Sequence, residues 1–291
     1  MTTGSDNYEL LRKYIENHCG IHIGGDKDYL IESRLASLVA RMGCKGFDDL
    51  YFKTRNDPTG VLRDQIVDAM TTNETLWFRD SHVWQTIENV LLPKLVDKIL
   101  AGRKLRARIW CAGCSTGQEA YSIAMCADRV AAKYAAKGLR AQHFDIVATD
   151  ISESALRIAG AGRYDRLTMS RGMRDGYKTR YFSPDGAVWV VRDEIRRLVR
   201  FERFNLLENF GPLGLFDMVL LRNVAIYFSD RYKQDLFNRI AKTLYPGGAV
   251  LLGASESLVG YKMDLERHED GPVVYYAMPD TPGAESIEQT Q

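Results

Sequence analysis

What this sequence lacks narrows the functions open to it. Its 291 residues contain no apolar run of about 18, the length that a membrane-spanning helix needs. The net charge is only +1, so a global electrostatic attraction to nucleic acid is missing. Residues 1–6 do not show the basic-then-apolar pattern of a secretory signal. We therefore expect a cytoplasmic protein that neither inserts into a membrane nor binds nucleic acid.

Cysteine and histidine are also scarce. The five cysteines are an odd number, which argues against a disulfide framework. Cys111 and Cys114 form a CxxC pair, but no second pair of ligands occurs at zinc-binding spacing. We interpret the pair as packing residues and expect no metal site. The five histidines are scattered, and no Ser/His/Asp or Cys/His constellation stands out.

Two phosphate-binding signatures are missing as well. Neither GxGxxG nor GxxxxGK[ST] occurs. Instead, residues 109–112 predict a buried strand, Gly113 and Gly117 bound a tight turn, and helical spacing begins at Gln118. A short loop with small side chains lets the backbone approach a nucleoside cofactor, and the helix N-terminus adds N–H donors.

An acid follows the next expected strand. The run 143–150 predicts a strand that ends at Asp150, whose carboxylate can accept hydrogen bonds from both hydroxyls of a ribose. It lies 33 positions after Gly117 (150 − 117), whereas dinucleotide-binding folds place this acid about 20 residues on. This loop fits a nucleoside without a pyrophosphate, such as S-adenosylmethionine. Taken alone, it fits a plain turn in an α/β core equally well.

The pattern along the chain predicts an α/β protein with a helical N-terminal domain. We expect helices over residues 1–78, followed by a linker and connecting helix over residues 79–104. From residue 105 to 278, strands and helices alternate, which favours a parallel sheet that ends in an antiparallel strand. A turn at Pro184-Asp185-Gly186 between strand-like runs predicts a small, largely β insertion over about 163–204. The small and polar tail, 279–291, is expected to be disordered.

One predicted helix, about 27–42, carries a basic stripe beside its apolar face. Arg34, Arg41 and Lys45 are spaced by seven and four residues, so they share one side. Such a stripe is either a solvated flank, whose alkyl stems cover the edge of the core, or a docking strip for an acidic helical partner.

Five strings together resemble one family. They are TTNETLWFRD (71–80), AGCSTGQEAYS (112–122), ATDIS (148–152), FNLL (204–207) and RNVAIYF (222–228), in that order along the chain. In these strings the chain resembles the CheR family of chemotaxis-receptor glutamate O-methyltransferases. The resemblance implies a Rossmann-like class I methyltransferase domain, with a small inserted β subdomain, behind a helical receptor-recognition domain.

The resemblance also implies an activity and a set of residues. The enzyme would transfer methyl from S-adenosylmethionine to glutamates on the cytoplasmic methylation helices of chemoreceptors, leaving S-adenosylhomocysteine. Because glutamate is already ionised near neutral pH, no general base is needed. The implied cofactor-binding residues are Asn73, Thr75, Arg79, Ala112, Gly113, Glu119, Asp150, Asn205, Leu206, Asn223 and Val224.

Catalytic and substrate-binding roles are implied in the same way. Arg79 would capture a carboxylate, either that of the cofactor or that of the incoming glutamate, and the Tyr227 hydroxyl would orient the glutamate. The resemblance favours the docking interpretation of Arg34, Arg41 and Lys45. The short connection 181–189 predicts that no receptor C-terminal peptide is gripped.

Two other interpretations stay open at this point. One is a methyltransferase of the same fold that acts on a small molecule or on nucleic acid, and the absence of an NPPY string speaks against the latter. The other is a non-catalytic adaptor that retains the cofactor pocket, against which the intact Arg79, Asn223 and Tyr227 argue.

Overall fold

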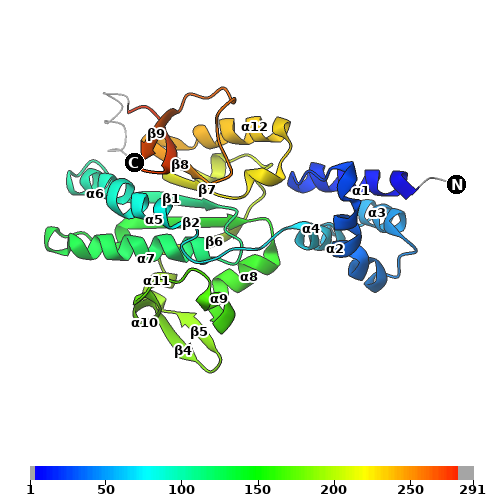
Figure 1. Cartoon of the computed structure of the whole chain (residues 1–291), viewed down its shortest axis with the longest axis horizontal. Helices are drawn as coiled ribbons and strands as arrows, with labels where there is room; N and C mark the ends of the chain where they lie inside the picture. Colours follow the sequence, from blue (N-terminus) through cyan, green and yellow to red (C-terminus); the bar gives the residue numbers. More distant parts are fainter. Residues whose placement is uncertain (1–3, 281–291) are drawn as a thin grey trace.

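The computed structural model describes residues 4–280 (Figure 1). Part of the tail expected to be disordered, from residue 281 on, lies outside the described residues. The N-terminal part consists of α1 (Gly4–Cys19), η1 (Gly25–Lys27), α2 (Asp28–Arg41), α3 (Phe47–Arg55) and α4 (Val61–Met70). These helices bury a core of their own, which includes Leu11, Ile15, Ile31, Leu35 and Ile66. They form a helical unit beside the sheet.

The rest of the chain is built on a seven-stranded sheet with the order β6-β2-β1-β7-β8-β10-β9. The first five strands run parallel, and β10 pairs antiparallel with β8 and β9. The expected α/β fold with an antiparallel edge is confirmed. The strands are β1 (Ala107–Ala112), β2 (Phe144–Asp150), β6 (Val199–Arg203), β7 (Phe216–Leu221), β8 (Leu244–Leu252), β9 (Glu266–Asp270) and β10 (Val273–Ala277).

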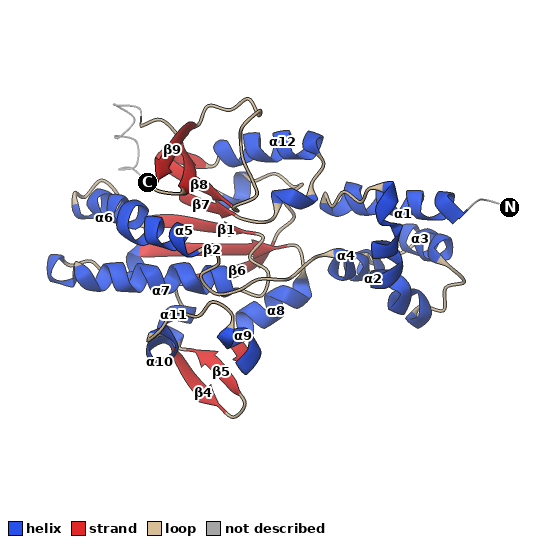
Figure 2. Ribbon diagram, in the orientation of Figure 1, coloured by secondary structure: helices blue, strands red, loops and turns tan. Residues whose placement is uncertain are grey.

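Helices cover both faces of this sheet (Figure 2). Alternation along β1 shows why: Ile109 and Cys111 join the core under α7, whereas Trp110 and Ala112 join the core under α12. One face carries α5 (Ser81–Thr86), α6 (Leu92–Leu100) and α7 (Gln118–Lys133), and the other carries α12 (Asp230–Ala241). The remaining α8 (Glu153–Ala161) packs on β2 and β6, and short turns lie at η3 (Ala135–Lys137), η4 (Ala141–His143), η5 (Gly211–Leu213) and η6 (Ala225–Tyr227).

The connecting helix, expected within residues 79–104, contains a π-helical turn. This turn, η2 (Ile87–Leu91), separates α5 from α6. Pro93 sits at the start of α6 and has no N–H to donate to the preceding turn, so the regular hydrogen-bond ladder cannot pass through it.

The small sheet differs from the expected insertion at its C-terminal limit. It contains only β3 (Arg163–Asp165), β5 (Val188–Val191) and β4 (Phe182–Asp185), in that order. Three short helices, α9 (Arg166–Ser170), α10 (Tyr177–Tyr181) and α11 (Asp193–Arg196), accompany it. The limit of 204 is wrong, because β6 pairs with β2 in the large sheet. The apolar residues of β6 predict a strand, but they do not show in which of the two sheets the strand pairs.

Strand order reverses at β1, which has β2 on one side and β7 on the other. Ligands of open α/β sheets bind outside the carboxyl ends of the strands at such a reversal. The loops after β1, β2, β7 and β8 therefore gather where a site is expected.

The helical unit contacts the loop after β7 through main chain. His22 N donates to the Tyr227 carbonyl at 2.8 Å, and Ile21 forms an antiparallel bridge with Phe228. Gly20 makes this approach possible: its φ is +77°, and a Cβ there would lie 2.2 Å from the Phe228 ring. An ion pair of 2.7 Å between Arg203 and Asp64 adds a second contact.

Gly20→Ala should destabilise the protein more than Gly43→Ala does. Both glycines have positive φ, but a Cβ on Gly43 meets nothing within 4 Å. We expect Gly43→Ala to cost about 1–2 kcal/mol from backbone strain alone, and Gly20→Ala to cost a further ~1–3 kcal/mol from overpacking against Phe228. Urea unfolding measures both, and equal losses would contradict the close docking.

Candidate functional site

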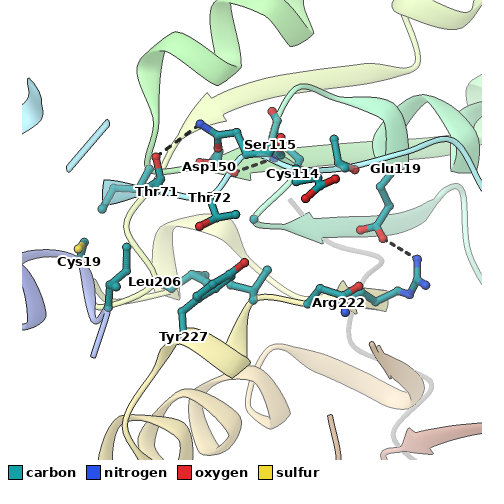
Figure 3. A pocket seen from close by; sticks show the side chains of 18 of the residues that line it. Cys19, Thr71, Thr72, Cys114, Ser115, Glu119, Asp150, Leu206, Arg222 and Tyr227 are labelled. Atoms are coloured by element: carbon teal, nitrogen blue, oxygen red, sulfur yellow. Dashed lines mark hydrogen bonds and ion pairs between the residues drawn. The ribbon is translucent and has the colours of Figure 1, made fainter. Parts of the chain in front are cut away.

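A pocket opens at the carboxyl edge of the parallel strands (Figure 3). It contains about 970 Å³ of empty space when the part that is open to solvent is included. Asp150 and Ser115 lie on one wall, with Leu206 and Tyr227 opposite them. Of the residues expected at the site, the pocket brings together Asn73, Thr75, Arg79, Gly113, Glu119, Asp150, Asn205, Leu206, Asn223, Val224 and Tyr227.

Four expected residues lie elsewhere. Ala112 ends β1 and is buried in the core instead of lining the pocket. Arg34 and Arg41 belong to α2, and Lys45 follows that helix. These three basic residues do not line the pocket, although Arg34 reaches its wall through a hydrogen bond to Thr72.

The glycine turn after β1 packs directly against two other loops. Gly113 has a φ of +75°, and a Cβ there would lie 2.5 Å from the Val224 side chain. The N–H groups of Gly113 and Cys114 both donate to the Thr149 carbonyl, at 2.8 and 2.9 Å. The turn thus joins the ends of β1 and β2 to the loop after β7, with no room for a side chain at Gly113.

Asp150 is held rigidly at the end of β2. Its carboxylate accepts hydrogen bonds from Ser115 N at 2.7 Å and Ser152 N at 2.9 Å. Burial raises the pKa of Asp150, and the backbone N–H groups oppose this rise. A carboxylate has about four lone-pair sites, so acceptor capacity remains for a ligand's hydroxyl groups.

Glu119, in the first turn of α7, is the second acid of the pocket, and its side chain is 14% exposed. Burial raises its pKa, and the neighbouring charge of Arg222 lowers it. An acid whose pKa is raised in the folded state adds stability at low pH and loses that contribution as the pH rises through the raised value. Near neutral pH, Glu119 therefore depends on its 2.9 Å ion pair with Arg222.

The residue-by-residue reading of the sequence assigned no role to Arg222. Its side chain is only 1% exposed, and its Nη2 donates to the Arg79 carbonyl at 2.8 Å and to Asp80 at 2.7 Å. With Glu119 as its third partner, Arg222 joins three parts of the chain. They are α7, the loop after β7 and the segment 71–80, which precedes α5. A signal was present, because a cation that directly follows a fully buried strand, β7, is costly there unless it is paired.

The backbone of Arg79 is held by two hydrogen bonds, whereas its side chain has no hydrogen-bond or ion-pair partner within residues 4–280. Its carbonyl accepts from Arg222 and also from Trp84 Nε1, at 2.9 Å. The neighbouring Phe78 and Asp80 have φ values of +47° and +61°, so this segment is held in a strained conformation. Among residues 4–280, no hydrogen-bond or ion-pair partner is recorded for the half-buried Arg79 guanidinium, which lines the pocket. Its charge lowers the pKa of Glu119.

Residues 71–80, which we call the linker, are also held by the other units. Ser115 Oγ donates to the Asn73 carbonyl at 3.0 Å, and Arg34 Nη2 donates to Thr72 at 2.9 Å. On the side of the small sheet, Trp77 N donates to the Arg171 carbonyl at 3.1 Å. The linker thus contacts all three parts of the molecule.

Asn205 has an additional role that the sequence did not suggest. Its amide donates to the His18 carbonyl at 2.7 Å and accepts from Leu207 N at 3.0 Å. One N–H and one lone pair remain for a ligand. Beside it, Leu206 supplies an apolar wall (Figure 3).

Cys111 and Cys114 behave as packing residues. Both are buried, and burial raises the pKa of each thiol well above its usual value. The part of the chain that the structure describes holds no group of three or more His, Cys, Asp or Glu side chains arranged for a metal ion. Between residues 4 and 280, no helix is both long and apolar enough to cross a bilayer.

Comparison with known proteins agrees with this geometry. Residues 6–71 match the all-alpha domain of CheR methyltransferases, and residues 73–273 match their SAM-binding domain. A chemotaxis protein methyltransferase of Pseudomonas putida, Cher2, is 42% identical over 95% of this chain and 99% of its own length. Chemotaxis protein methyltransferase 1 of Pseudomonas aeruginosa is 44% identical, with the same coverage. Chemotaxis protein methyltransferase 1 of Vibrio cholerae is 39% identical over 96% of this chain and 98% of its own. The chain therefore belongs to the CheR family of chemotaxis methyltransferases, whose cofactor is S-adenosylmethionine.

Proposed function

We propose that this enzyme methylates glutamate side chains on the cytoplasmic methylation helices of chemoreceptors, forming glutamate methyl esters. The observation that carries the proposal is the Arg79 guanidinium. It lines the pocket and has no hydrogen-bond or ion-pair partner among residues 4–280, whereas Asp150 and Glu119 in the same pocket already make protein contacts. A guanidinium held in this way suits bidentate capture of a carboxylate.

The pocket fits S-adenosylmethionine by the chemistry of its walls. The turn at Gly113 leaves the backbone bare, Asp150 and Glu119 offer acceptors, and Leu206 offers an apolar surface. These groups suit the hydroxyl and ammonium donors and the adenine ring of the cofactor. When bound, the cofactor supplies an electrophilic methyl group on a positively charged sulfur.

The chain's own residues then have to bind, orient and exclude water. Asp150 and Glu119 would accept hydrogen bonds from the cofactor, and Arg79 would hold either its carboxylate or the incoming glutamate. The phenol of Tyr227 points into the pocket (Figure 3), and no hydrogen bond of its hydroxyl is recorded within residues 4–280. It would donate to one glutamate oxygen, so that the other faces the methyl group.

No proton has to be removed in this reaction. Glutamate is ionised at neutral pH, so the rate depends on alignment and on the electrostatics of a pocket closed to water.

We propose that the receptor docks on the basic stripe, but on two of its three residues, Arg41 and Lys45. Arg41 and Lys45 are exposed, and no ion pair of their side chains is recorded among the described residues. Arg34 is half-buried and holds the linker through Met70 O and Thr72. Arg41 and Lys45 would therefore meet the acidic receptor helices, and Arg34 would act on the pocket wall.

The small sheet supports a receptor contact without a C-terminal peptide tether. β4 and β5 are joined by only two residues, Gly186 and Ala187. A longer loop would be expected for a peptide grip, so we propose the tether-independent type. The cytoplasmic location of the enzyme stays a prediction.

The first test is transfer of radiolabelled methyl from S-adenosylmethionine to membranes that contain the host's chemoreceptors. We expect base-labile label on receptor bands with the wild type, and a loss of about 100-fold or more with Arg79→Ala, because positioning by a bidentate clamp is lost. Arg157→Ala, which removes an exposed helix ion pair, serves as the control and should label normally.

The outcomes separate the competing functions. Label that resists base would mean that an amine or thiol is methylated instead of a carboxylate. Cofactor binding without label on any receptor would favour the adaptor. Label that is unchanged in Arg79→Ala would remove Arg79 from the site.

The docking proposal predicts a different defect. Arg41→Glu combined with Lys45→Glu should lower receptor labelling roughly tenfold, because like charges then meet at the interface, while S-adenosylhomocysteine binds as in the wild type. Lys137→Glu, an exposed cation beyond the far end of α7, should leave both properties unchanged. Normal labelling by the doubly reversed variant would show that receptors dock elsewhere.

A further inference from the structure

One carboxylate, that of Glu256, accepts four backbone hydrogen bonds beside the pocket. Its Oε2 accepts from Asn223 N at 2.6 Å and from Gly253 N at 2.7 Å. Its Oε1 accepts from Val224 N at 3.0 Å and from Ile226 N at 3.1 Å. Hydrogen bonds to an ionised acceptor are about twice as strong as neutral ones, so this single side chain organises two loops.

The two loops follow adjacent parallel strands. Residues 222–228, which we call the β7 loop, leave β7, and Gly253 directly follows β8. Gly253 has no space for a side chain: a Cβ there would lie 2.6 Å from Asn223 Nδ2 and 2.8 Å from both Asn223 N and Glu256 Oε2. The contact between the loops is therefore tight and is centred on the Glu256 carboxylate.

The conformation of the β7 loop needs such an anchor. Asn223 has a φ of +60°, a strained value for a residue with a side chain. Val224 lies against the glycine turn at Gly113, and Tyr227 reaches into the pocket. All three residues contribute to the site. The loop's own hydrogen bonds, from Tyr227 N to Val224 O at 3.2 Å and from Phe228 N to Ala225 O at 3.0 Å, do not involve the strained Asn223, whose N–H is held by Glu256.

We propose that Glu256 is a positioning residue, which holds the β7 loop so that Asn223 and Val224 reach the cofactor and Tyr227 faces the methyl acceptor. Glu256 acts through these residues and does not itself line the pocket. The part that concerns Tyr227 rests on the proposed function, whereas the part that concerns the cofactor does not.

The test measures the Kd of S-adenosylhomocysteine by calorimetry, corrected for the folded fraction. Glu256→Gln keeps the shape but turns an NH₂ group toward two N–H donors, and we expect at least tenfold weaker binding. The matched control is Glu194→Gln, an exposed acid in the first turn of α11, which should bind within twofold of the wild type. If Glu256→Gln does not fold, Gly253→Ala displaces the same loop with the carboxylate intact, and tenfold weakening is again expected.

A double-variant cycle distinguishes positioning from a general structural role. In an Asn223→Ala background, Glu256→Gln should add less than threefold, because the Asn223 side chain that Glu256 positions through the backbone N–H is already absent. Independent multiplication of the two losses would overturn the proposal. Wild-type affinity of the Glu256→Gln protein for S-adenosylhomocysteine would also overturn it. If Glu256→Gln does not fold, wild-type affinity of the Gly253→Ala protein would do the same. Failure of the wild type to methylate any receptor, with these affinities as expected, would contradict the proposed function alone.

Discussion

The pocket depends on one buried cation. The Arg222 side chain is 1% exposed and is paired with Glu119, Asp80 and the Arg79 carbonyl. A charge in such a place is tolerated only when its partners are in place, and removing one member of a buried pair typically costs about 3–5 kcal/mol. Since these partners come from α7 and from the linker, Arg222 is stable only when the pocket is assembled.

This dependence links the helical unit to the chemistry. The linker leaves α4, is held by Arg34 on one side and by Arg222 on the other, and carries Arg79 between the helical unit and the sheet. The helical unit also contacts the β7 loop through His22 and Phe228. A receptor helix that docks on α2 would therefore bind to a unit with two connections to the pocket. One is the linker, and the other is the hydrogen bond from His22 N to the Tyr227 carbonyl.

Local sequence patterns were sufficient to predict the features that depend on residues close together in the sequence. Alternating strands and helices predicted the parallel sheet, and the glycine turn and the strand that ends at Asp150 predicted two residues, Gly113 and Asp150, that line the pocket. A short apolar run also predicted the strand β6. The run does not show that this strand pairs with β2, and this pairing places β6 in the large sheet. The π-helical turn before α6 was missed because the helical period continues through it.

Residues whose role depends on distant partners were the ones missed. Arg222 and Arg79 are 143 positions apart, and Glu256 holds Asn223 from 33 positions away. No periodicity in a single sequence brings such groups together. Arg34 shows the same limit: its spacing placed it correctly on the basic stripe, yet its hydrogen bond to Thr72 spans 38 positions and turns it toward the linker.

The most direct test of this account is the free energy of unfolding of Arg222→Met in urea. Arg157→Met serves as the comparison, because Arg157 belongs to an exposed pair in α8. We expect a loss of about 3–5 kcal/mol for Arg222→Met, since the largely covered Glu119 is left without its cation, and a loss of about 0.5 kcal/mol or less for Arg157→Met. Equal, small losses in the two variants would contradict the claim that Arg222 holds the pocket together.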